Sequence, residues 1–559
     1  MAEDRIIRTC KAFSAAAAIA AILVPAPALA SRPSSAARTY LEARAAAIEG
    51  NHSRSAQLLA ELVDNSAANK TITKEALSQA ISGGDMKLAL RLVRTLPAAE
   101  IPIEARMMQV ADALRSNDAK RAVALLHERS EAGDLGFIRP FVQAWATADA
   151  KDQVGALSAL DGLTAGNLLA ALGPEHRALI LLKFGKIAEA QPFVDQALKT
   201  GPAREARLRM AFAEAYLGLG DRARATAMVQ GLGTGAIRAG QLVLQGKSDG
   251  IRIDNSRRAF SELLVVLAAE LHRLRNETMP VALSQVARFS APENSAATVM
   301  LGLMLSRRGR VDEAVAALRS VPASDPLYSQ ARDAEVRALI DADRHAEALQ
   351  VAQRVVSAGN PGVSDFARLG DVLSNMKRHN EAAAAYARAL QLVGSTAPGE
   401  DRWPLLLLQA AALEEANRWP ETRHLLTQAL ALAPNEPLIL NFLGYAKLER
   451  GEDLDGAEAM IRKASALAPD DASITDSLGW AVYKRGRTKE AIEILTRAAK
   501  GDPAQAEIHE HLGDALYKAG NKYEARYAWS AALVTAEDDV AKRLNAKIEA
   551  GLTPATAAP

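Results

Sequence analysis

Four side chains near the C-terminus are of types that bind metal ions: Glu507, His509, Glu510 and His511. Imidazole and carboxylate groups are common zinc ligands. On a helix, however, residues two apart point about 200° away from each other, so His509 and His511 cannot share one ion. We therefore expect no metal site here.

Two glycine-containing stretches fit a loose dinucleotide-binding pattern, G-x-G-x-x-A, at residues 218–223 and 231–236. Such a site needs a preceding strand and a surrounding βαβ unit. One stretch lies in a turn between expected helices and the other in a Gly-rich segment, so neither has that context. The sequence contains no G-x4-G-K-[ST], H-E-x-x-H or G-x-S-x-G motif. We therefore predict neither an enzyme nor a bound cofactor.

The composition favours helices and a protein partner. Hydrophobic residues make up 49% of the chain but aromatic residues only 4%, so the apolar residues are mostly alanine and leucine, which are good helix formers. Lys plus Arg number 67 and Asp plus Glu 66, and without residues 1–30 there are 64 of each sign. A balanced charge argues against nonspecific nucleic-acid binding and gives no long-range attraction to an anionic membrane.

Small residues recur with a period of 34 or 35 residues. Gly444, Gly479 and Gly513 each follow a leucine, and alanines come twelve or thirteen residues later and again seven residues after that: Ala457, Ala491 and Ala525, then Ala464, Ala498 and Ala532. Two antiparallel helices that cross closely need small residues where their backbones meet. Pro469 and Pro503 follow the second helix in two repeats, and proline cannot continue a helix. The period therefore predicts helical hairpins.

The same period divides the whole chain. It predicts a linker at 31–38, degenerate hairpins at 39–230, a Gly-rich break at 231–256, a regular array at 257–545 with its best repeats at 296–330, 364–394 and 438–535, and a disordered tail at 546–559. The break contains β-friendly fragments around 241–253, so a short β-hairpin there is one interpretation. An ordinary degenerate helical hairpin is the other.

The repeat resembles the tetratricopeptide repeat (TPR), with its L-G-x-x-Y … A-x3-F-x2-A … P pattern. The resemblance implies an all-α, right-handed superhelical solenoid in two halves, with the first helix of each hairpin lining a concave groove. It places these residues in a partner-binding groove: Asn441, Tyr445, Asp476, Trp480, Lys484, Glu510, Asp514 and Tyr517.

Three of these groove residues, Tyr445, Trp480 and Tyr517, form an aromatic row in a chain with few aromatic residues. The rings could be binding hot spots, or they could pack against the adjacent helix. For Trp480 we predict partial exposure in the groove. An aromatic row edged by charges of both signs suits an extended or helical protein segment.

The last repeats, from Asn441 to about Leu533, also resemble a family of long proteobacterial envelope TPR proteins. They include NFLGYAKLERGEDLDGAEAMI, DSLGWAVYKRGRTKEAIEIL and AEIHEHLGDALYKAGNKYEARYAW. One class of this family, the LbcA type, consists of outer-membrane lipoproteins that are adaptors for a carboxyl-terminal processing protease. The resemblance therefore implies a protease as the partner.

The N-terminus reads as a secretory signal peptide, residues 1–30. Basic residues precede an apolar run at 12–24, and an Ala28-Leu29-Ala30 end predicts cleavage between Ala30 and Ser31. The alternative is an uncleaved anchor, but the run is shorter than the ~20 residues a membrane span needs. Cys10, the only cysteine, precedes the run and so cannot be a lipoprotein cysteine.

Together these features predict a non-enzymatic periplasmic scaffold or adaptor with no transmembrane anchor in the mature chain. Its partners would be proteins bound in the concave groove, among them a periplasmic protease, and not nucleic acid. The alternative is a scaffold for envelope polysaccharide export or outer-membrane assembly.

Overall fold

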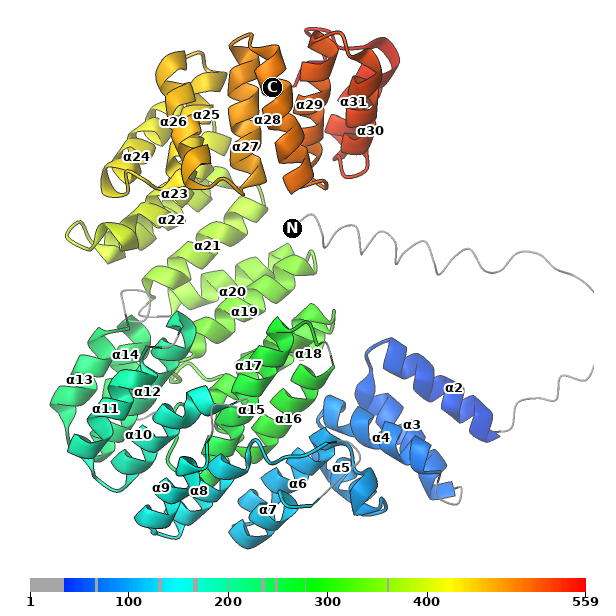
Figure 1. Cartoon of the computed structure of the whole chain (residues 1–559), viewed down its shortest axis with the longest axis vertical. Helices are drawn as coiled ribbons and strands as arrows, with labels where there is room; N and C mark the ends of the chain where they lie inside the picture. Colours follow the sequence, from blue (N-terminus) through cyan, green and yellow to red (C-terminus); the bar gives the residue numbers. More distant parts are fainter. Residues whose placement is uncertain are drawn as a thin grey trace, which may run out of the picture. The chain divides into compact units, whose positions relative to one another are not determined.

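The computed structural model describes residues 35–558 except 66–68, 129–132, 164–168, 200, 233–236, 247–249, 277 and 359–360. None of these residues forms a strand, and they fold into α-helices joined by short turns (Figure 1). The predicted all-α class is therefore confirmed. The signal peptide at 1–30 and its cleavage site, Ala30–Ser31, lie outside the described residues.

The chain divides into two compact units, and the boundary between them in the sequence falls between Leu392 and Val393. The helices of the N-terminal unit are α2 (Ser35–Ile48), α3 (His52–Asn65), α4 (Lys70–Gly83), α5 (Met86–Val93), η1 (Ala98–Glu100), α6 (Ile103–Arg115), α7 (Ala119–Leu125), α8 (Arg139–Asp149), α9 (Gln153–Asp161), η2 (Ala170–Leu172), α10 (Gly173–Lys183), α11 (Ile187–Ala197), α12 (Pro202–Gly218), α13 (Arg222–Gln230), α14 (Ile237–Leu244), α15 (Ser256–Arg273), α16 (Met279–Ser290), α17 (Ser295–Arg307), α18 (Val311–Arg319), α19 (Tyr328–Asp341), α20 (His345–Ser357), α21 (Val363–Asn375) and α22 (His379–Val393).

The helices of the C-terminal unit are α23 (Gly399–Glu415), α24 (Trp419–Leu432), α25 (Pro437–Glu449), α26 (Leu454–Leu467), α27 (Ala472–Lys484), α28 (Thr488–Gly501), α29 (Ala506–Lys518), α30 (Lys522–Leu533) and α31 (Asp538–Ala550). Consecutive helices pair as hairpins, and α25, α27 and α29 are the first helices of three successive hairpins.

The repeat glycines lie where the two helices of a hairpin cross. A Cβ atom added to Gly479 would stand 2.6 Å from Leu495 Cγ, which is too close for any real Cβ contact. The other repeat glycines abut the second helix in the same way: Gly302 against Leu318, Gly370 against Tyr386, Gly444 against Ile461 and Gly513 against Trp529. The close approach predicted from the period is therefore confirmed.

In the N-terminal unit, the α15–α16 hairpin packs against helices far away in the sequence. It contacts α4, α6 and α8, as Figure 1 shows. The backbone N–H of Ser256 donates to Asp149 Oδ2 at 2.8 Å, and Gln285 Nε2 donates to the Ser82 carbonyl at 3.4 Å. The predicted Gly-rich break is thus followed by a hairpin that turns back onto the first helices.

The break itself is more ordered than predicted. Residues 237–244 form α14, so the fragment interpreted as β-friendly is helical; a short apolar run cannot distinguish a strand from a helix. Ile251 and Ile253 are buried, and Arg207 Nη1 donates to the Ile251 carbonyl at 2.7 Å. The short β-hairpin considered for 241–253 is therefore wrong within the described residues.

Two further boundaries differ from the prediction. Helix α2 begins at Ser35, inside the expected linker. At the other end, α31 continues to Ala550, and both Gly551 and Ala558 are buried, so the predicted disordered tail at 546–559 is wrong over its described residues. The prediction failed because small, polar and proline residues look like a free tail, while here their small size lets the backbone approach a helix.

No helix in the described part of the chain is long and apolar enough to cross a membrane.

Replacing Gly479 with alanine tests the hairpin crossing. We expect Gly479→Ala to lower the free energy of unfolding by about 1–3 kcal/mol, because the new Cβ collides with Leu495 and pushes α28 away from α27. Gly218→Ala is the matched control, since nothing lies within 4 Å of a Cβ added there. Thermal or denaturant unfolding measures both. Equal stability of the two variants would contradict the close crossing.

Candidate functional site

The eight residues predicted to line a groove lie on α25, α27 and α29 of the C-terminal unit. They are Asn441 and Tyr445 on α25, Asp476, Trp480 and Lys484 on α27, and Glu510, Asp514 and Tyr517 on α29. Four of them are buried: Asp476, Trp480, Glu510 and Asp514. Tyr445, Tyr517 and Asn441 are partly buried, and Lys484 is exposed. We call these eight residues the partner face.

Trp480 is a core residue, so the prediction that it is partly exposed is wrong. Its side chain is 1% exposed. The indole ring stacks on Tyr483 at a centroid distance of 4.8 Å and on His511 at 4.0 Å. Its Nε1 donates to Glu449 Oε1 at 3.3 Å. Packing against the adjacent first helix, one of the two interpretations of the aromatic row, is what the structure shows for this ring.

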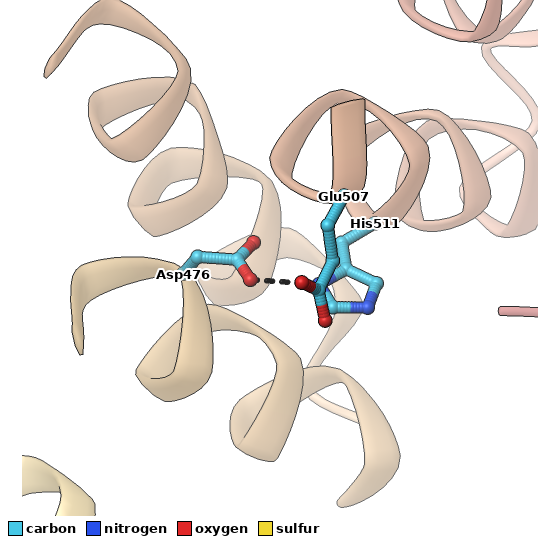
Figure 2. Close-up of side chains that lie close together, drawn as sticks. All are labelled: Asp476, Glu507 and His511. Atoms are coloured by element: carbon cyan, nitrogen blue, oxygen red, sulfur yellow. Dashed lines mark hydrogen bonds and ion pairs between the residues drawn. The ribbon is translucent and has the colours of Figure 1, made fainter. Parts of the chain in front are cut away.

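Behind the indole, a histidine and an aspartate from consecutive repeats form a buried pair. His511 Nδ1 lies 2.8 Å from Asp476 Oδ2, and both residues are buried (Figure 2). Glu507, one turn before His511 on α29, also points toward them, and the three ligand-type atoms lie within 4.8 Å of one another. His509 instead contacts the Pro503 carbonyl at 3.1 Å, so the two histidines diverge as predicted.

This triad combines ligand types that bind divalent cations. Asp476, Glu507 and His511 offer two carboxylates and one imidazole, whereas a closed structural zinc site takes four protein ligands. From the sequence, the two histidines were grouped with their neighbours, and Asp476, which lies 35 residues from His511, was assigned to the groove and not to this cluster. Two spacings could have pointed to this triad. Glu507 and His511 are four residues apart and so share one face of a helix, and Asp476 lies about one repeat period before His511.

Within the triad, the charges around His511 shift its pKa. Burial opposes the charge on the imidazole, but the charge of Asp476 and its hydrogen bond outweigh that cost and raise the pKa of His511. Glu507 and Asp514 act in the same direction. Burial also raises the pKa of Glu507 itself. The surroundings of His511, stacked on Trp480, therefore favour its charged form more than water does.

A second buried network ties α31 to α29. Lys547 is fully buried, and its Nζ lies 2.6 Å from Glu510 Oε1 and 2.8 Å from Asp514 Oδ1. Arg543 donates to both Glu510 oxygens, at 2.8 and 2.7 Å. Although burial works against the charge of Glu510, these two cations hold the pKa of its carboxyl below the usual range. The acidic part of the partner face is thus already neutralised by the chain's own last helix.

The end of the chain covers part of the same face. Asp514 accepts a hydrogen bond from Trp529 Nε1 and another from the backbone N–H of Ala558, both at 2.9 Å. Gly551 abuts the ring of Tyr517. Sequence inspection missed Arg543, Lys547 and Ala558 because they follow the last recognisable repeat.

A pH series tests the Asp476–His511 pair. Because the pKa of His511 is raised in the folded state, its stabilisation is fully present below the ordinary histidine pKa of about 6.5 and is lost as the pH rises through the folded-state value. We expect Asp476→Asn to cost about 1–3 kcal/mol of unfolding free energy near pH 5.5 and clearly less near pH 9. His509→Gln is the control and should show no such trend. A cost for Asp476→Asn that is independent of pH would contradict the ion pair.

Tetratricopeptide repeat models match residues 282–329 and 477–540, and a second such model matches residues 366–392. No curated protein matches the sequence significantly.

The solved structures that the chain is similar to share little sequence with it. One is described as the APC/C hetero-tetramer Cut9-Hcn1, with 14% identity over 93% of this chain and 97% of that one, at a TM-score of 0.39. Another is a MamA structure, with 19% identity over 30% of this chain and 94% of that one, at a TM-score of 0.25. The family models match hairpins α17–α18, α21–α22, α27–α28 and α29–α30, and we conclude that this chain contains tetratricopeptide repeats.

Proposed function

We propose that this chain is a periplasmic TPR scaffold that carries out no catalysis itself and presents protein partners to one another, as an adaptor for a carboxyl-terminal processing protease. TPR arrays bind proteins because stacked hairpins create long continuous surfaces. The observation that carries the proposal is the TPR match over residues 477–540. In the hairpins of this segment the two helices cross closely at Gly479 and Gly513, as the repeat requires.

The location and the partner class rest on the sequence. Residues 1–30 have the basic start, apolar run and small-residue end of a signal peptide. The resemblance of residues 441–533 to LbcA-type proteins favours a processing protease as the partner. The balanced charge of the remaining chain favours a protein over nucleic acid.

One experiment tests location and partner together. The full chain is expressed with its own N-terminus in a Gram-negative host, purified from the periplasmic fraction and mixed with a carboxyl-terminal processing protease from the same envelope. We expect the N-terminal sequence to begin at Ser31. We also expect the chain to co-elute with the protease and to speed cleavage of a client protein.

The export controls follow from the signal sequence. Ala30→Leu should block processing because the cleavage site needs a small residue there, whereas Leu29→Ala, at a position open to most residues, should leave it intact. Recovery of the wild-type chain with Met1 from the cytoplasm would contradict the location. Failure of correctly processed chain to bind the protease or alter its activity would contradict the adaptor role.

A further inference from the structure

The last residues of the chain, 551–558, fold back onto the partner face. Gly551 has a φ of +88°, a left-handed conformation that glycine adopts without strain. A Cβ atom there would collide with the Tyr517 hydroxyl. Leu552 then packs beside the cluster that contains Trp529 and Leu544. The absence of a side chain at residue 551 is thus what allows the backbone to turn in over α29.

A compact turn returns the chain end to α29. The backbone N–H of Thr553 donates to Thr556 Oγ1 at 3.0 Å, and the N–H of Ala557 donates to the Thr553 carbonyl at 3.0 Å. Between these bonds, Pro554 and Ala555 are exposed. These two hydrogen bonds of the turn join residues within the segment 553–557, and the residue after it, Ala558, is buried.

Ala558 is the anchor of this tail. It is 5% exposed, whereas its neighbour Ala557 is exposed. Its methyl group belongs to the buried cluster that includes Trp480 and Ala515, and its N–H donates to Asp514 Oδ2 at 2.9 Å. The tail therefore binds through one small side chain and one backbone hydrogen bond, as a docked peptide does.

The charges around Asp514 define what else could bind there. Lys547 is already paired with both Glu510 and Asp514. An acidic group arriving beside Asp514 would meet two buried carboxylates, and a basic group would meet Lys547. The surface therefore favours an uncharged segment that brings a small side chain and a free backbone N–H.

We propose that this surface, formed by Asp514, Ala515 and Tyr517 over the cluster that contains Trp480, is a peptide-binding site that its own C-terminal tail occupies. Its partner ligand is an extended, uncharged, Ala- and Pro-rich protein segment that places a small residue where Ala558 lies. This proposal rests on the proposed function, because it names the segment that a TPR scaffold of this kind would bind. Since the tail is tethered, it competes at a high effective concentration, so the site opens only to a segment that displaces it.

The test uses the full chain and a fluorescently labelled peptide with the sequence of residues 551–559, GLTPATAAP. Ala558→Trp places a large ring at the buried anchor and should expel the tail, whereas Ala557→Trp changes the exposed neighbour and should leave it docked. We expect the peptide to bind the Ala558→Trp chain at least about ten-fold more tightly than the wild-type or the Ala557→Trp chain. The same substitutions made in the peptide should abolish binding at 558 and spare it at 557.

Absence of peptide binding to a folded Ala558→Trp chain, or equal binding to all three chains, would overturn the proposal. Circular dichroism and the thermal midpoint establish folding, and a chain ending at Ala550 is the second tail-free variant if Ala558→Trp unfolds. The protease assay on the same variants separates the two proposals. Protease binding without peptide binding would refute only this site, whereas loss of protease binding by the wild-type chain would refute the proposed function.

Discussion

The close crossing of two helices at a single small residue is the constraint on which the rest of the C-terminal unit depends. Gly444, Gly479 and Gly513 each let one helix of a hairpin lie against a side chain of the other. Because the hairpins repeat every 34 or 35 residues, side chains about one period apart on neighbouring helices come into contact. Asp476 lies beside His511, 35 residues on, and Asp514 lies beside Lys547, 33 residues on. The polar bridges between repeats are thus a consequence of the period set by the glycines.

The outer face of the last hairpin in a repeat array must be covered by some other segment, because no further hairpin packs against it. Here α31 takes the position of the next first helix, and Arg543 and Lys547 supply the charges that Glu510 and Asp514 require. Burying acidic groups is costly unless they are paired, so these two cations make the capped end possible. The tail then covers the part of the face that α31 leaves, through Ala558. The same surface is therefore both the capped end of the fold and the candidate binding site.

The sequence was sufficient to predict the hairpins, their period and the class of repeat, because the glycines and alanines at the crossing points recur at a fixed spacing. The residues that it predicted to line a groove lie on α25, α27 and α29, the first helices of three hairpins, and their role in binding stays a prediction. It did not predict the burial of Trp480, whose ring stacks on Tyr483 and on His511 of the next first helix. Nor did it predict the burial of Asp514, because Lys547 and Ala558, which contact it, lie in segments without the repeat pattern. In the sequence, Lys547 resembles an ordinary surface lysine. Only its separation of 33 residues from Asp514, about one period, indicates that the two side chains could pair. In the N-terminal unit, the α15–α16 hairpin packs onto α4, α6 and α8, and such contacts between distant segments leave no local signal.

Thiol labelling measures whether residues 551–558 are docked on α29 through Ala558. In a Cys10→Ser background the chain has no other cysteine, so Ala558→Cys and Ala557→Cys each introduce a single thiol on adjacent residues. If the tail is docked, the Ala558→Cys variant should react with a soluble thiol reagent at least about ten-fold more slowly than the Ala557→Cys variant, and denaturant should abolish the difference. Equal labelling rates for the two variants under native conditions would show that the tail is free and that Ala558 does not anchor it.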